Sequence, residues 1–375
     1  GQFFRAGAGL DEEYRMKNPA WSIFGTVDFE LSERLTLSAG ANYTRDRKSF
    51  VTNVQSSDVF SSLPLAGPLA ALKPLQFLPP FLNVPNSVEP GKTKDSDLAW
   101  SLRAAYEATD TVNLYATYAT GFKASSVNLS RDSRPLAADL PAIVAAGLAT
   151  PNLTSGSRFA APEESEVYEV GLKGQWSVAA LNLAVFKQSI KGFQSNIFTG
   201  TGFALANAGK QSTFGIEFDG SVRPVEGLNL TMAVTYLDPK YDSFINSAFG
   251  DISGTTPAGI PALTMAAGGT YTHEFAGGTR AILHADYHYE SEVQIVEGLS
   301  GFPASVAQGL KREVNQLNAS FTIALTNGLE LGVWGRNLTN AKYLTTVFPA
   351  VAQAGSVSGY PNQPRTYAVT GRFKF

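Results

Sequence analysis

The chain has 375 residues, a formal net charge of −3 and no cysteine, which excludes disulfides and thiolate metal sites and gives no sign of a nucleic-acid partner. Charged residues make up 16% of the chain, against roughly 25% in ordinary soluble domains. No apolar run approaches the ~20 residues that a membrane-spanning helix needs.

Segments of alternating apolar and polar residues follow one another along the chain. This period of two is typical of β-strands with one apolar and one polar face. Pairs of segments flank short turns, so the sequence predicts antiparallel hairpins and about thirteen strands in all. The predicted segments are 21–30, 35–44, 98–106, 112–118, 168–172, 180–198, 214–222 and 228–236, then two hairpins that turn at 276–278 and 326–328, and a last strand at 365–375.

The connections between the predicted strands are of two kinds. One set has about two to five residues, rich in Gly, Asn and Asp, as tight hairpin turns require. The other set is longer, and short turns that alternate with long loops are typical of an outer-membrane β-barrel, whose long loops lie outside the cell. The predicted long loops are 51–95, 124–163, 245–261, 298–310 and 349–363.

The last strand ends on an aromatic residue. Phe373 and Phe375 share one face with Tyr367, while Arg372 and Lys374 lie on the other. An outer-membrane barrel often ends in this way, because its closing strand puts an aromatic side chain at the membrane interface. The alternative is the edge strand of a soluble sandwich.

Ionisable side chains alternate with apolar ones on the strand at 280–292. In a barrel this polar face would line a wet lumen, where charges cost far less than in a dry core; a solvent-exposed face of a soluble sheet explains this strand alone equally well. Further carboxylates share the inward parity on neighbouring strands. The lumen candidates are Arg280, His284, Asp286, His288, Glu290, Glu169, Glu217 and Asp219.

No metal site, cofactor site or enzyme active site is predicted. His284 and His288 lie on one face of a strand, but four residues of strand separate them by roughly 13 Å, too far to share one ion. No serine is matched to these histidines as a nucleophile would be, and no glycine-rich phosphate loop joins a strand to a helix.

Two groups of residues near the long loops are candidates for binding. Phe77 and Phe81 belong to a proline-rich apolar stretch that either contacts a hydrophobic ligand or packs against other loops. Arg45 and Arg47 belong to a charge run where a strand leaves the membrane. They either meet lipopolysaccharide phosphates or an anionic ligand, or are simply solvated.

Five segments resemble the TonB-dependent receptor family. A strand start NAG is followed at 213–241 by a GxE stretch, a proline-containing turn and an alternating strand that ends in TYLD and Tyr241. The other four are similar to further family motifs and occur in family order. They are YATYATGFK at 115–123, PEESEVYEVGLK at 162–173, WGRNLTNAKY at 334–343 and the terminal strand at 365–375.

The resemblance implies a 22-stranded barrel with a plugged lumen in the outer membrane of a Gram-negative bacterium. About thirteen antiparallel, up-and-down strands correspond to the carboxy-terminal part of such a barrel, so residues 1–375 are expected to be a partial barrel that lacks the plug domain and has an open carboxy-terminal edge.

The function that the resemblance implies is energised uptake of a scarce small molecule, most often an iron–siderophore complex. The expected partners are the lipid of the outer membrane, TonB and the plug domain. The alternatives are a passive porin-like channel and a soluble all-β binding protein.

Overall fold

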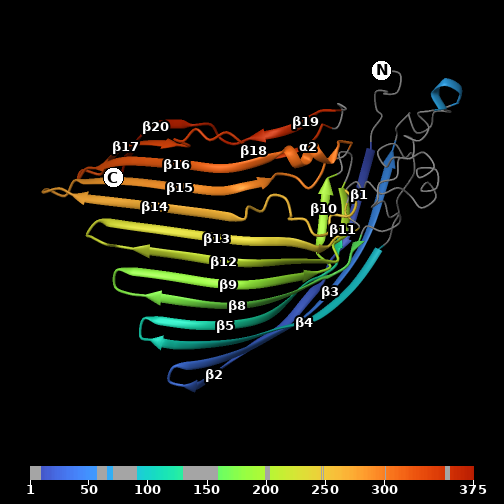
Figure 1. Cartoon of the computed structure of the whole chain (residues 1–375), viewed down its shortest axis with the longest axis horizontal. Helices are drawn as coiled ribbons and strands as arrows, with labels where there is room; N and C mark the ends of the chain where they lie inside the picture. The colour runs from blue at the N-terminus through green and yellow to red at the C-terminus, as the bar shows by residue number, and fades with distance from the viewer. Residues whose placement is uncertain are drawn as a thin grey trace.

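The computed structural model is built around one wide, curved antiparallel β-sheet (Figure 1). It describes residues 10–56, 66–70, 91–129, 159–198, 203–245, 247, 249–299, 301–350 and 355–375. Among them there is no helix with the length and hydropathy to cross a membrane. The prediction of an all-β, antiparallel, up-and-down architecture is confirmed.

Neighbours in the sheet are neighbours in the sequence, because each strand pairs with the next one that spans the wall. The strands of the sheet are β1 (Leu10–Lys17) and β2 (Ala20–Ser32), β3 (Leu35–Ser56), β4 (Gly91–Thr109), β5 (Val112–Lys123), β8 (Glu163–Gln175), β9 (Ala179–Lys191), β12 (Lys210–Val222), β13 (Leu228–Ser243), β14 (Leu263–Glu274), β15 (Arg280–Gln294), β16 (Lys311–Ala324), β17 (Leu329–Arg336) and β20 (Thr366–Phe373).

β1 and β2 are two parts of one long strand. Both pair with β3, and the pairs Lys17↔Ser49 and Ala20↔Asp46 keep one register. Pro19 lies between them and cannot donate a backbone hydrogen bond, although its carbonyl accepts one from the Arg47 amide at 3.1 Å. The fourteen strands of the sheet therefore occupy thirteen places, which agrees with the number predicted from the sequence.

The sheet stays open along its two edges. Figure 1 places β2 and β20 at opposite sides of the sheet, and no pairing joins them in the part of the chain that the structure describes. The short turns gather at one end of the strands, which we call the turn end. The smaller elements gather at the other, which we call the loop end. These are β6 (Ser126–Val127), β7 (Phe159–Ala160), β10 (Gln194–Phe198), β11 (Phe203–Asn207), α2 (Ala304–Gly309), β18 (Leu344–Pro349) and β19 (Val357–Pro361).

Some predicted boundaries need correction at the loop end. The expected strand 180–198 is interrupted, because the chain turns at Gly192 with φ +66° and continues as β10. β3 and β4 extend into the expected loop 51–95. The expected loops 298–310 and 349–363 contain α2 and β19. Periodicity could not reveal these short elements, because too few residues carry the pattern.

The wall is one layer thick, with an apolar face on one side and a polar face on the other. On the apolar face Ile23 and Val27 are 68% and 70% exposed. Aromatic rings mark its two borders, with Tyr43 of β3 at one and Tyr106 of β4 at the other. Tyr106 pairs with Leu35, eight residues before Tyr43, so the two rings lie about 26 Å apart along the strand direction. That distance is of the order of the ~25 Å apolar band of membrane barrels.

The turn between β12 and β13 depends on a glycine. Gly227 has φ +77°, and a β-carbon there would lie 2.2 Å from the Thr272 carbonyl oxygen. Gly277, in the turn between β14 and β15, has φ +102° but no atom within 4 Å of an added β-carbon. Both turns need a glycine backbone, and the first also needs the space.

We expect Gly227→Ala to destabilise the barrel more than Gly277→Ala. Each substitution forces a left-handed backbone on alanine, at about 1–2 kcal/mol, and the first adds a clash with Thr272. Urea unfolding in detergent, followed by the heat-modifiable gel band, measures the difference. Equal midpoints for the two variants would show that the clash is relieved at no cost.

Candidate functional site

The polar face of the sheet carries all eight lumen candidates. The register places Glu169, Glu217 and Asp219 on the face opposite to the exposed apolar side chains. On β15 the same face carries Arg280, His284, Asp286, His288 and Glu290, while Tyr287 and Tyr289 point to the apolar face. Strand alternation thus brings these residues to one surface, although they do not form one cluster.

One polar cluster is centred on Tyr115 of β5. Its hydroxyl donates a hydrogen bond to Glu169 Oε1 at 2.7 Å. The Arg103 guanidinium lies 5.1 Å from the ring centroid and Lys173 Nζ lies 5.7 Å from it. Two cations therefore lie close to the Tyr115 ring that bonds Glu169, and the cluster joins half-buried side chains of neighbouring strands on the wall itself.

Five of the other lumen candidates form separate pairs: Asp219, His284, Asp286, His288 and Glu290. Asn182 Nδ2 donates to Asp219 Oδ2 at 2.9 Å. His284 Nε2 lies 3.4 Å from Asp286 Oδ1, and Asn318 Nδ2 donates to the same carboxylate at 2.7 Å. A shallow groove of about 610 Å³ runs past Asp219, His284 and Asp286. Its lining offers carboxylate and imidazole groups to whatever occupies the lumen.

A third pair lies closer to the loop end. His288 Nε2 and Arg312 Nη2 lie 3.2 Å and 3.1 Å from the two oxygens of Glu290. Each of the two histidines therefore has its own carboxylate partner. Within the described residues no three His, Cys, Asp or Glu side chains are grouped so as to hold a metal ion. Arg280 lies at the turn end of the same strand, away from these pairs.

The structure corrects the placement of two loop candidates. Arg45 and Arg47 lie within β3 and not on a loop, and their parity is that of Tyr43 on the apolar face. Asp46 lies between the two arginines in the chain and Lys48 follows Arg47. Both point to the polar face, where Lys48 Nζ lies 2.5 Å from Asp46 Oδ1. The charge run is thus divided between two faces by strand alternation. Phe77 and Phe81 lie outside the described residues.

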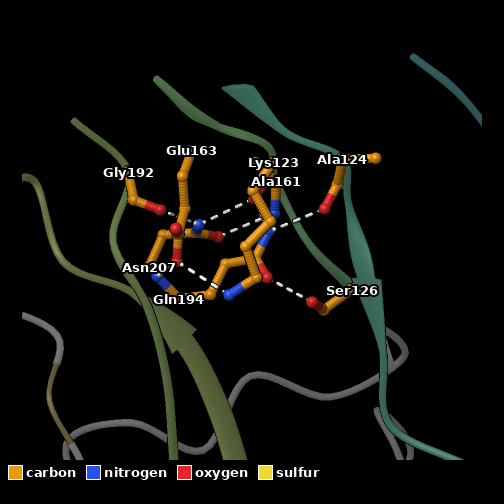
Figure 2. A network of polar contacts seen from close by, with 8 residues as sticks. All are labelled: Lys123, Ala124, Ser126, Ala161, Glu163, Gly192, Gln194 and Asn207. Atoms are coloured by element: carbon orange, nitrogen blue, oxygen red, sulfur yellow. Dashed lines mark hydrogen bonds and ion pairs between the residues drawn. The ribbon is translucent and has the colours of Figure 1, made fainter. Parts of the chain in front are cut away.

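Sequence reasoning missed a polar network at the loop end, which we call the rim clamp (Figure 2). Glu163 Oε1 accepts hydrogen bonds from Lys123 Nζ at 3.1 Å and from the Gln194 amide at 2.7 Å. The side chain of Gln194 donates to the Ala124 and Ala161 carbonyls and accepts a hydrogen bond from the Ser126 hydroxyl. These contacts tie the ends of β5 and β9 to the start of β8.

Asn207 completes the rim clamp. Its Oδ1 accepts from the Ala161 amide at 2.8 Å, and its Nδ2 donates to the carbonyls of Ala161 and Gly192 at 2.9 Å and 2.6 Å. A single side chain thus satisfies three backbone groups from two connections, where the strand ladders have ended. A backbone group that has left its strand ladder needs such a partner wherever burial keeps water from it.

The rim clamp is made largely of residues from the sequence motifs. Lys123 ends YATYATGFK, Glu163 follows Pro162, and Asn207 begins NAG. Gln194 belongs to none of them, so no motif could have pointed to it. The motifs were recognisable one by one, but their meeting in space depends on the pairing of β5, β8, β9 and β12.

A small apolar cluster lies beside the rim clamp. Ala208, Tyr241 and Phe244 are buried there, and Phe193 packs against them. The Tyr241 hydroxyl donates to Glu297 Oε1 at 3.0 Å, and the Ala258 amide donates to the same oxygen at 2.9 Å. Burial raises the pKa of the Glu297 carboxyl above its ordinary 4.5, and the two hydrogen bonds oppose that rise without cancelling it.

Most of the chain matches the model of one known protein family. The family model described as "TonB dependent receptor-like, beta-barrel" matches residues 2–338. The chain belongs to this family. TonB-dependent receptors are outer-membrane proteins of Gram-negative bacteria, which places the apolar face of the sheet against lipid and the polar face in the lumen.

Solved receptor structures share the fold at low sequence identity. The ferric yersiniabactin uptake receptor FyuA from Yersinia pestis matches 98% of this chain with a TM-score of 0.71 and 17% identity. The siderophore receptor PiuA from Acinetobacter baumannii and the ferric-catecholate import receptor Fiu from E. coli K12 each match 96%, with TM-scores of 0.64 and 0.63 and identities of 15% and 14%. This chain covers 47%, 44% and 45% of their respective lengths, so it spans about half of each receptor.

A further asparagine of a receptor motif has a structural role of the same kind as Asn207. Asn337, in WGRNLTNAKY, is 3% exposed and has φ +50°. Its side chain accepts from the Ala341 amide at 2.8 Å and donates to the carbonyls of Ala341 and Gln363. In this receptor barrel the motif asparagine holds the connection that leaves β17.

We expect Asn207→Ala to loosen the rim clamp without unfolding the receptor barrel. The variant leaves the Ala161 amide and the Gly192 carbonyl without their side-chain partner, at about 1–3 kcal/mol each where burial keeps water away. The Ala161 carbonyl keeps the hydrogen bond that it accepts from Gln194 Nε2. Amide hydrogen exchange should rise at 159–163 and 192–194. The matched control is Asn229→Ala, whose side chain makes no hydrogen bond within the described part of the chain. Unchanged protection in Asn207→Ala would remove the clamp role.

The pKa of Glu297 predicts how the loop it contacts responds to pH. Because its pKa is higher in the folded loop than in the unfolded one, the loop binds the proton more tightly when folded and gains stability as the pH falls. The gain begins at the raised pKa and is complete below 4.5. Exchange of the Ala258 amide, corrected for intrinsic rate, should show it. Glu297→Gln keeps both accepted hydrogen bonds and should flatten the dependence; a flat wild-type profile would contradict the assignment.

Proposed function

We propose that the chain forms part of an outer-membrane receptor that takes up an iron–siderophore complex with energy supplied through TonB. The observation that carries this proposal is the match to the receptor barrel model over residues 2–338. The ligand class is supported by the descriptions of FyuA, PiuA and Fiu, which are receptors for siderophores or ferric chelates.

The polar face supports a place for a plug domain in the lumen. Its charges are spread over several strands, and some already have partners on the wall, such as Asp219 with Asn182. Glu217 precedes Asp219 by two residues on β12 and therefore lies on the same face. It makes no hydrogen bond or ion pair with the described residues. A plug with basic side chains would find acceptors there, and would complete a receptor of which this chain supplies thirteen wall positions.

The alternatives are less well supported. A soluble binding protein would expose the apolar face to water, with side chains such as Phe29 at 60% exposure along many strands. A passive channel remains an outcome of the experiment below. We infer no enzymatic activity, since the family consists of transport receptors.

We expect deletion of the gene in its source bacterium to abolish energised uptake of one ferric siderophore. Labelled iron uptake from a panel of chelates, under iron limitation, measures it. The full gene should restore uptake, and an uncoupler or loss of TonB should abolish it again. Uptake that survives both treatments would identify a passive channel, and an unchanged iron profile would exclude the iron–siderophore ligand.

A further inference from the structure

Basic side chains gather on the apolar face just beyond its aromatic border at the loop end. Trp21 and Tyr43 form part of that border, with ring centroids 5.6 Å apart. Arg45 of β3 pairs with Trp21 of β2, and the next residues toward the loops on this face of β3 and its neighbours include further basic side chains. The group, which we call the basic patch, consists of Lys17, Arg45, Arg47, Lys92 and Lys94.

The register shows that the basic patch is compact. Arg47 pairs with Lys94 across β3 and β4, while Lys17 and Lys92 pair with Ser49 from its two sides. Adjacent strands lie about 4.8 Å apart, so three strands span roughly 10 Å. Arg45, two residues before Arg47, extends the basic patch toward the membrane by about 7 Å.

Among the residues that the structure describes, no carboxylate forms an ion pair with the basic patch. Arg47 and Lys94 are like charges directly opposite each other, which destabilises a sheet. No Asp or Glu shares this face along β3 and β4. In the described ranges none of the five side chains forms an ion pair, and Lys17, Arg47, Lys92 and Lys94 are exposed.

The same face is different on β12 and β13. There Lys240 Nζ lies 3.0 Å from Asp238 Oδ2, and Lys210 Nζ lies 3.9 Å from Asp242 Oδ2. Lys240 follows the exposed Tyr236 by four residues, as Arg47 follows Tyr43, so the two cations lie at the same height above an aromatic side chain. Cations at this height therefore differ: Lys210 and Lys240 have a carboxylate partner, and the five of the basic patch have none among the described residues.

We propose that the basic patch binds phosphate groups of lipopolysaccharide in the outer leaflet of the outer membrane. Trp and Tyr side chains settle at the headgroup level of a membrane. Cations one to three register levels beyond them face the headgroup anions. The loop end of a receptor barrel faces the outside, where lipopolysaccharide supplies those anions. The two arginine guanidiniums match phosphate oxygens bidentately, and an anion between Arg47 and Lys94 removes their repulsion.

The test measures lipopolysaccharide on the full-length receptor after extraction of the outer membrane in detergent. The variant is the triple substitution R45Q/R47Q/K94Q, and the matched control is Lys240→Gln. The heat-modifiable band shows that each protein is folded. Bound lipopolysaccharide per protein, measured by mass spectrometry, should fall about tenfold or more in the triple variant, from loss of three cations near an anionic surface, and should be unchanged in the control.

A second arm uses the wild-type protein alone, so it gives a result even where the triple variant does not fold. Delipidated receptor is offered lipid A with its phosphates, the same lipid A after dephosphorylation, or phosphatidylglycerol. Binding that depends on the phosphates and exceeds that of phosphatidylglycerol supports the proposal. Equal binding of dephosphorylated lipid A, equal binding of phosphatidylglycerol, or full retention by a folded triple variant would overturn it.

Discussion

The need to pair every backbone group within a membrane decides the rest of this structure. Lipid offers no hydrogen bonds, so each N–H and C=O in the wall must bond to a neighbouring strand. The continuous ladders from β2 to β20 meet that need between the thirteen positions, although not along the two open edges of the described sheet. They also set the register, and a slip of one residue would exchange the lipid-facing and lumen-facing side chains of a whole strand.

A wall one layer thick has no interior of its own, so buried packing occurs where the wall ends. Phe244 and Ala208 are almost fully buried at the loop end, beside Tyr241. There the strand ladders stop, and side chains must satisfy backbone groups instead. Asn207 and Asn337 do this at two separate connections. These two motif asparagines are thus explained by hydrogen bonding at the rim, and ligand contact is not required to account for them.

The two faces also divide the charges by environment. Carboxylates such as Glu169 and Asp286 lie in the lumen and have hydrogen-bond donors on adjacent strands. Cations on the other face lie beyond the aromatic border, where long side chains reach the headgroups. The lumen is thereby prepared for polar occupants, and the outer border for the anionic surface of the membrane.

The strands, their two faces and the turn glycines can be predicted without the fold, because a period of two residues and a positive φ are local properties. The sequence therefore predicted the polar parity of His284 and Asp286 and the thirteen positions of the wall. It could not join Lys123, Glu163, Gln194 and Asn207, because contacts between distant segments depend on which strands pair and in what register. The predicted strand ended at residue 44, so Arg45 and Asp46 could be assigned to opposite faces only once the pairing with β4 showed that β3 continues past them. The folded sheet answers both questions, since strand pairing turns sequence parity into a position relative to the membrane.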